Sequence, residues 1–80
     1  MKITRAQMHR EAEYLETVAI PRAEAAAADG DRAAADPGAS DYARSVASHA
    51  AGVARQHADE FAGFAAALRD GEIPDGLDLT

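Results

Sequence analysis

The chain has 80 residues, a formal net charge of −6 at pH 7 and no cysteine. A chain of this length supports one domain with a small core, and the absence of cysteine excludes disulfides, thiol catalysis and zinc–thiolate sites. Alanine accounts for 22 residues, more than half of the apolar 48%. Because alanine favours helix but buries little surface, the composition predicts helices that need a partner to complete their core.

The negative charge is concentrated in two short segments, 29–41 and 71–80, each with a net charge of −3. Nucleic-acid binding requires a basic surface that neutralises phosphates, and the sequence contains no basic stripe. No apolar stretch approaches the roughly 20 residues of a membrane-spanning helix, and residues 1–5 are not followed by the apolar core of a signal peptide. We therefore expect a cytoplasmic protein that binds neither nucleic acid nor membrane, with acidic segments that serve solubility.

The first predicted helix covers residues 4–29. Thr4 and Gln7 have the spacing of a capping box at its start. Apolar residues then recur at intervals of three and four positions: Met8, Ala12, Leu15, Ala19, Ala23 and Ala26. Pro21 lies inside this pattern and predicts a kink or a break, because proline lacks the N–H that a helix requires.

The second predicted helix covers residues 40–70. One apolar stripe runs through it at helical spacing and consists of Val46, Ala50, Val53, His57, Phe61, Phe64 and Leu68. We expect this stripe to face the first helix. Two residues could cap the start of this helix. One is Ser40, and the other is Asp36, which is followed by Pro37 at the first helical position.

Both predicted helices end at an Asp-Gly pair, Asp29-Gly30 and Asp70-Gly71, because glycine readily adopts the left-handed conformation that follows a helix. Within the connection, residues 32–36 could form an extra turn. The connection between the helices is rich in Gly, Asp and Pro. These features predict an all-α fold in which residues 1–70 form one antiparallel helical hairpin, followed by an acidic and apolar tail, 71–80.

The first helix has more apolar surface than one neighbour can bury. At about 100° per residue, its apolar arc runs from Tyr14 through Val18 to Ala23 and covers roughly half the circumference. Pairing of two hairpins into a four-helix bundle would bury the surplus, so we expect a homodimer. The alternative is a hairpin that offers the same face to a different protein.

His57 lies in the middle of the apolar stripe of the second helix. If the turn is centred between the two predicted helices, Glu11 faces His57, and the two form a His–carboxylate pair that responds to pH. The simpler interpretation is a histidine that fills space and makes one hydrogen bond. A metal site formed by His57, Glu60 and Glu11 is a further alternative, although the order of His57 and Glu60 reverses the Glu-x-x-His motif of diiron bundles. We expect no cofactor.

Two further groups of polar residues lie along the predicted helices. Asp41, Ser45 and His49 imitate a nucleophile triad in composition, but one helix face provides neither separate backbone segments nor an oxyanion hole. His9 and Glu13 have a spacing that can chelate a metal, yet they fit a ladder of surface charges equally well. We therefore predict no catalytic residue and no enzymatic activity.

Partner binding is predicted from small and exposed apolar residues. Gly52 and Gly63 lie on the face of the second helix that points away from the first, where they would allow another backbone to approach closely or are simply tolerated. The large apolar residues of the tail either fold back on the open end of the hairpin or form a linear motif for a partner. The predicted partner-binding residues are Tyr14, Val18, Gly52, Gly63, Ile73, Leu77 and Leu79.

The sequence thus favours a small non-enzymatic protein–protein interaction module, acting as an adaptor, an assembly factor or a small structural subunit. The alternative is an acidic inhibitor of the phage type, whose loop and tail occupy a basic surface of a nucleic-acid-handling protein. The third reading is a metal-binding four-helix site centred on His57.

Overall fold

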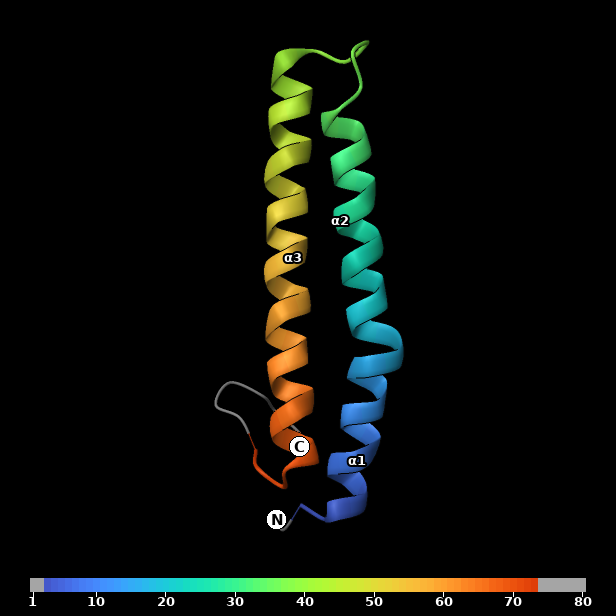
Figure 1. Ribbon diagram of the computed structural model, residues 1–80, viewed down its shortest axis with the longest axis vertical. Coiled ribbons are helices and arrows are strands. Elements are labelled where there is room, and N and C mark those ends of the chain that lie inside the picture. Colours follow the sequence, from blue (N-terminus) through green and yellow to red (C-terminus); the bar gives the residue numbers. More distant parts are fainter. Residues whose placement is uncertain (1–2, 74–80) are drawn as a thin grey trace.

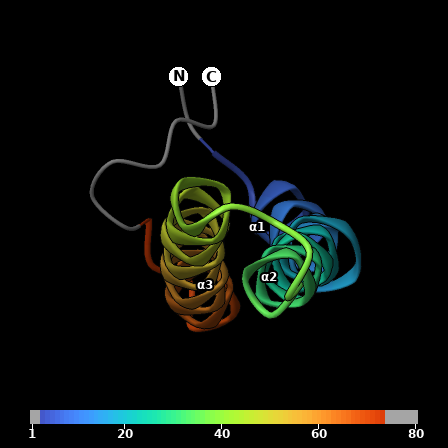
Figure 2. The same ribbon diagram turned by 90° about the horizontal axis from the view of Figure 1, so that it is seen from above.

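The structure is a computed structural model in which residues 3–73 are described. They form two helical arms that lie side by side and run in opposite directions (Figure 1). The first arm consists of α1 (Arg5–Tyr14), the π-helical turn η1 (Leu15–Ala19) and α2 (Ile20–Ala34), and the second arm is α3 (Asp41–Arg69). The regular structure in residues 3–73 is entirely helical, as the composition predicts. The molecule is a rod of 53 × 20 × 18 Å, and an end-on view shows one arm beside the other (Figure 2).

The first arm begins with the predicted capping box. The hydroxyl oxygen of Thr4 accepts a hydrogen bond from the backbone N–H of Gln7 at 3.2 Å, and the side-chain oxygen of Gln7 accepts one from the backbone N–H of Thr4 at 2.7 Å. These bonds satisfy N–H groups that have no partner within the helix. The capping prediction for the start of α1 is confirmed.

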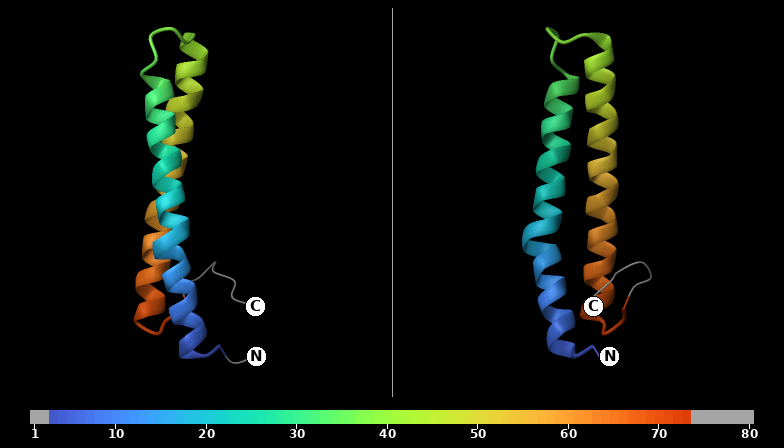
Figure 3. Two further views of the ribbon diagram at one scale, coloured as in Figure 1. Left: turned by 90° about the vertical axis from the view of Figure 1, so that its right-hand side faces the viewer. Right: turned by 180° about the vertical axis from the view of Figure 1, so that it is seen from behind.

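The contact between the arms is a seam of mostly alanine residues at heptad spacing. On α3 the seam residues follow one another at alternating steps of four and three positions: Ala47, Ala51, Ala54, Ala58, Phe61, Ala65 and Leu68. On the first arm they are Met8, Ala12, Leu15, Ala19, Ala23, Ala27, Gly30 and Ala34. All these residues are buried or half-buried. Because a repeat of about 3.5 residues keeps one face of a helix turned toward its neighbour, the arms stay together along the rod (Figure 3).

The π-helical turn η1 keeps the seam of the first arm in phase. The heptad steps are regular before Ala19 and after Ala23, but the step between these two residues is one position too long. A π turn absorbs one extra residue because its N–H bonds to the carbonyl five positions earlier, here from Ile20 to Leu15. The irregularity expected at Pro21 is therefore a bulge just before the proline, and the arm continues as a helix beyond it.

The prediction that the first helix ends at Asp29-Gly30 is wrong, because α2 continues to Ala34. Gly30 has a φ outside the left-handed region. A Cβ atom built on Gly30 would lie 2.9 Å from the carbonyl oxygen of Ala47 and 2.9 Å from the Cβ of Ala51. Gly30 is therefore required by the close approach of the two arms and not by a turn.

Residues 35–40 connect the arms. The hydroxyl oxygen of Ser40 accepts a hydrogen bond from the backbone N–H of Ala43 at 3.0 Å, which makes Ser40 the cap of α3. A carboxylate oxygen of Asp36 accepts a bond from the N–H of Gly38 at 2.9 Å and closes a local turn. Of the two caps that the sequence leaves open, Ser40 begins the helix and Asp36 shapes the connection.

The end of α3 at Asp70-Gly71 is as predicted. Gly71 has a φ of +82°, and its N–H donates to the carbonyl of Leu68 at 3.1 Å. The N–H of Glu72 donates to the carbonyl of Ala67 at 2.8 Å. This pair of bonds is a Schellman motif, which satisfies carbonyl groups that the helix leaves without a partner.

The register between the arms differs from the expected one. Asp31 of α2 pairs with Arg55 of α3, and Ala58 lines a groove together with residues of α2. His57, next to Ala58, therefore lies at the level of α2, whereas Glu11 belongs to α1. The expectation that Glu11 faces His57 is wrong, because α2 extends beyond its expected end and moves the turn toward α3.

The apolar stripe predicted for α3 faces the first arm only toward its C-terminal end. There Phe61, Phe64 and Leu68 pack with residues of α1 and η1 in an apolar cluster. Toward the connection, Val46 is 50% exposed and His57 is also exposed. The alanine seam lies between the arms in their place, since small side chains allow two helices to approach closely.

Candidate protein-interaction surface

The seam divides the rod into two sides. In a helix, the residue after a seam position is turned by about 100° to one side, and the residue before it is turned to the other. Because the arms are antiparallel, the residues that follow seam positions on both arms lie on one side. We call this the groove side, and we call the side formed by the residues that precede seam positions the stripe side.

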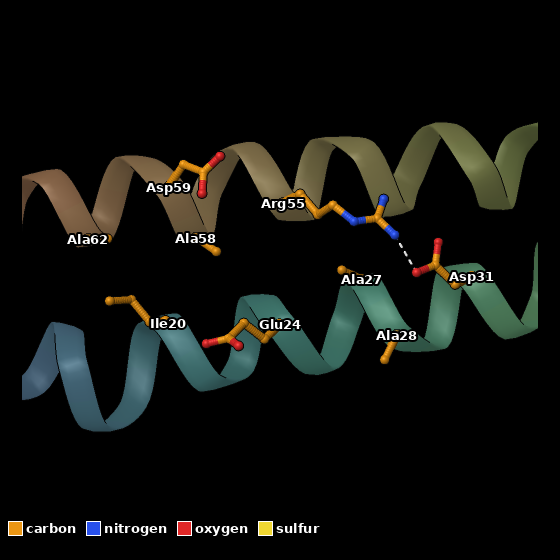
Figure 4. Close-up of a pocket in the computed structure, with 9 residues that line it drawn as sticks. All are labelled: Ile20, Glu24, Ala27, Ala28, Asp31, Arg55, Ala58, Asp59 and Ala62. Carbon is orange, nitrogen blue, oxygen red and sulfur yellow. Dashed lines mark hydrogen bonds and ion pairs between the residues drawn. The ribbon is translucent and has the colours of Figure 1, made fainter.

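The groove side is charged. Seven residues that directly follow seam positions line an open groove between α2 and α3 (Figure 4): Ile20, Glu24, Ala28, Asp31, Arg55, Asp59 and Ala62. Arg55 reaches across the groove and pairs with Asp31. Arg69 also follows a seam position, and it pairs with Glu16 at 2.6 Å. Two ion pairs thus join the arms on this side.

The ion pair of Glu16 and Arg69 changes the acid–base behaviour of both groups. The hydrogen bond from the Arg69 guanidinium, with its positive charge, holds the pKa of the Glu16 carboxyl below its usual value. In return, the hydrogen bond to Glu16 raises the pKa of Arg69. Both side chains are substantially exposed, so solvent screens the pair and its contribution to stability is small.

The stripe side differs between the two arms. On α3 it consists of Val46, Ala50, Val53, His57, Glu60, Phe64 and Ala67, and on the first arm of Gln7, Glu11, Tyr14, Val18, Arg22, Ala26, Asp29 and Ala33. Tyr14 and Val46 are each 50% exposed, while Val18 and Val53 are half-buried. The predicted partner residues Tyr14 and Val18 are therefore brought to the same side of the rod as the predicted stripe of α3.

Four consecutive stripe-side positions of α3 carry no formal charge when the histidine is neutral. These residues are Val46, Ala50, Val53 and His57, and we call them the α3 stripe. They follow the uncovered part of α3 from its first turns past its middle. The α3 stripe is the longest uncharged run on either side of the seam in the described part of the chain.

His57 is exposed within the α3 stripe. Its ring lies 6.2 Å from the ring of Phe61, with an angle of 38° between the planes. Within residues 3–73, no group of three His, Cys, Asp or Glu side chains is placed to hold a metal ion. The structure thus does not bring Glu11 to His57 and Glu60, and one chain does not assemble the metal site considered from the sequence.

The other polar groups singled out in the sequence lie on the surface. Asp41 pairs with Arg44, and Ser45 and His49 are exposed on the same helix. His9 and Glu13 are exposed on α1. These positions fit the surface charges expected for them.

Gly52 and Gly63 are exposed, and a Cβ atom built on either one meets nothing within 4 Å. Neither residue lies on the stripe side. Gly52 follows the seam residue Ala51 and belongs to the groove side. The structure therefore separates the two glycines from Tyr14 and Val18, with which they were grouped as partner-binding residues.

For the apolar tail, the sequence predicts either fold-back on the open end of the hairpin or a linear motif for a partner. Ile73 is 46% exposed. A Cβ atom built on Gly71 would lie 3.7 Å from the guanidinium of Arg5, so the chain leaves α3 beside the start of α1. Leu77 and Leu79 lie outside the described residues.

The aspartates near the connection have local partners. Asp29 pairs with Arg32, Asp31 with Arg55, and Asp41 with Arg44. The net charge of −3 of segment 29–41, which already includes Arg32, is therefore partly compensated by Arg44 and Arg55 of α3.

The sequence predicts the seam of the first arm as far as Ala23, since Met8, Ala12, Leu15, Ala19 and Ala23 are buried or half-buried, but it does not predict the seam of α3 or the two sides that the seam creates. The α3 alanines also have heptad spacing, but larger apolar residues one position before several of them mask this signal. Tyr42 is 80% exposed, and no pattern in the sequence singles it out.

Among the described residues, no helix combines the length and the apolarity needed to cross a membrane. Comparison of the chain with protein-family models, with curated proteins and with solved structures gives no match.

Proposed function

We propose that the protein is a non-enzymatic protein–protein interaction module, a helical hairpin that dimerises into a four-helix bundle and acts as an adaptor, an assembly factor or a small structural subunit. The observation that carries this proposal is the exposed α3 stripe beside a seam built from alanine. The buried core in the described residues contains six alanines and two leucines, Leu15 and Leu68. Such a core buries little apolar surface per residue.

The elongated shape of the molecule supports the proposal that it binds a partner. The radius of gyration is 16.1 Å, whereas a compact chain of this length has a value of about 12 Å. The accessible surface is 5482 Å², compared with about 4,600 Å² for a folded monomer of this mass.

Oligomeric state tests the proposal directly. Sedimentation equilibrium at micromolar concentration should give a mass near twice the 8.3 kDa of the chain. A mass of one chain at all concentrations, together with a sharp thermal transition, would contradict the four-helix bundle.

The location and partners form part of the same proposal. We place the protein in the cytoplasm, with a second copy or another protein as its partner, and with no role for nucleic acid or membrane. Affinity capture from the native host, followed by mass spectrometry, identifies any additional protein that the dimer assembles.

A further inference from the structure

We infer that the α3 stripe is the surface that a second copy of this chain covers, with the two α3 helices antiparallel across a two-fold axis. This inference rests on the proposed dimer and names the surface and the geometry that the dimer uses. The competing surface is the part of α3 around Gly52, on the groove side, and Gly63, on the adjoining outer face, where small residues leave space for another backbone.

The charge distribution favours the α3 stripe. A two-fold interface brings the same patch of both copies together, so a patch with charges of one sign repels itself. The α3 stripe has no formal charge with a neutral His57. The groove side, in contrast, carries Glu24 and Asp59 beside the ion pair of Asp31 and Arg55, and its burial would remove these charges from water.

The same distribution determines how the copies face each other. On the stripe side, the first arm carries Glu11, Arg22 and Asp29, whereas α3 carries Glu60 and its four positions of the α3 stripe are uncharged. Apolar surface is best covered when α3 of one copy lies on α3 of the other. In a stack of two rods this arrangement requires a two-fold axis perpendicular to the rods, which makes the two α3 helices antiparallel.

The length of α3 places the axis. α3 runs from Asp41 to Arg69, and its midpoint falls between Val53 and His57. Full overlap of two rods therefore puts Val53 and His57 at the centre of the interface, close to the same two residues of the other copy. Val46 of each copy then lies toward the end of the contact.

The test compares two double variants that add the same charge at the same spacing. V46E/H57E places two glutamates on the α3 stripe, and G52E/G63E places two on the competing face; all four positions are exposed in one chain. We expect V46E/H57E to weaken dimerisation by at least about a hundredfold in sedimentation, because like charges would be buried against each other. G52E/G63E should keep the wild-type dimer, and both variants should keep the helical circular dichroism spectrum.

Crosslinking provides a second readout that does not depend on disruptive substitutions. Because the chain has no cysteine, V53C and G52C each introduce a single thiol on neighbouring positions that point to different sides. A short bifunctional maleimide should link V53C into covalent dimers and leave G52C monomeric.

The outcomes separate this inference from the proposal on which it rests. A wild-type dimer that V46E/H57E leaves intact and G52E/G63E dissociates overturns the assignment of the surface but keeps the dimer. Equal crosslinking of V53C and G52C likewise contradicts the assignment of the α3 stripe as the interface between the two copies. A wild type that is monomeric overturns the dimer itself, and loss of a heterologous partner from V46E/H57E would then assign the stripe to that partner.

Discussion

Gly30 shows how a single residue sets the distance between the arms. Its missing side chain leaves room for the backbone of α3 at Ala47 and for the Cβ of Ala51. An isolated glycine in a helix is less favourable than alanine by about 1 kcal/mol. This loss is tolerated here because close packing of the alanine seam depends on it.

Substitution of Gly30 by alanine should therefore destabilise the protein. A Cβ atom at 2.9 Å from two atoms of the opposite arm forces the arms apart, and overpacking of this kind costs about 1–3 kcal/mol. Gly52→Ala is the matched control, because open space surrounds it and the gain in helix propensity should stabilise by about 0.5–1 kcal/mol. Chemical denaturation measures both changes, and a stabilised Gly30→Ala would show that the arms are not in close contact there.

The ion pair of Glu16 and Arg69 should stabilise the folded state by an amount that depends on pH. The pKa of folded Glu16 lies below its ordinary value of 4.5, so the folded state favours the ionised carboxylate. Its stabilisation is fully present above the unfolded pKa and is lost as the pH falls through the lower folded value. Since the side chains are exposed, the effect is expected to be small.

The measurement is the free energy of unfolding of Glu16→Gln and wild type between neutral pH and the acid range. The difference between the two proteins should shrink as the pH falls below 4.5. Glu24→Gln, on the same side of the rod, is the control. Its free energy of unfolding should change between neutral and acid pH by about as much as that of the wild type. A difference for Glu16→Gln that does not change with pH would contradict the role of the ion pair.

At the level of elements, the π-helical turn η1 accounts for both the spacing of the seam and the position of Pro21. The seam of the first arm takes three consecutive steps of four residues from Leu15 to Ala27, one residue more than heptad spacing, and η1 at the start of this stretch absorbs the extra residue. The bulge also places Pro21 in the first turn of α2. There the missing N–H and the ring are tolerated far better than in the middle of a regular helix.

Pro21→Ala should consequently have little effect on stability. Proline inside a regular helix costs about 3 kcal/mol, so its replacement there would stabilise the protein by a similar amount. With the bulge in place, we expect a change below about 1 kcal/mol, measured by thermal and chemical denaturation. A large stabilisation would mean that the proline strains the arm and that the bulge does not relieve it.

At the level of the whole molecule, the proposed dimer links folding to concentration. Association stabilises the folded state by mass action, so the midpoint of thermal unfolding should rise when the protein concentration is raised tenfold. Differential scanning calorimetry from about 10 µM to 1 mM covers the range in which a marginal two-helix rod would respond. A midpoint that stays constant over this range would indicate that one chain folds without a partner.

V46E/H57E provides the matched control for this measurement. If the dimer uses the α3 stripe, this variant should unfold at a lower temperature and its midpoint should depend less on concentration. G52E/G63E should retain the dependence of the wild type.

The local structure was largely determined by the sequence. Thr4 with Gln7, Ser40, and Asp70-Gly71 act through hydrogen bonds to backbone groups a few positions away. Such bonds do not depend on the rest of the molecule, so the start of α1 and the end of α3 could be predicted, and Ser40 was one of two candidates for the start of α3.

The apolar positions of the first helix up to Ala23 were predicted from the sequence, but the tertiary structure alone decided which face of α3 is buried. Val46, Ala50 and Ala51 all lie on apolar stripes with helical spacing, and periodicity does not distinguish a seam of small residues from a neighbouring stripe of larger ones. The distinction depends on how closely the arms approach and on the continuation of α2 through Gly30, which also moved His57 away from Glu11. Both are properties of two helices in contact, and the physical reason is that burial is fixed by the opposite surface and not by the residue itself.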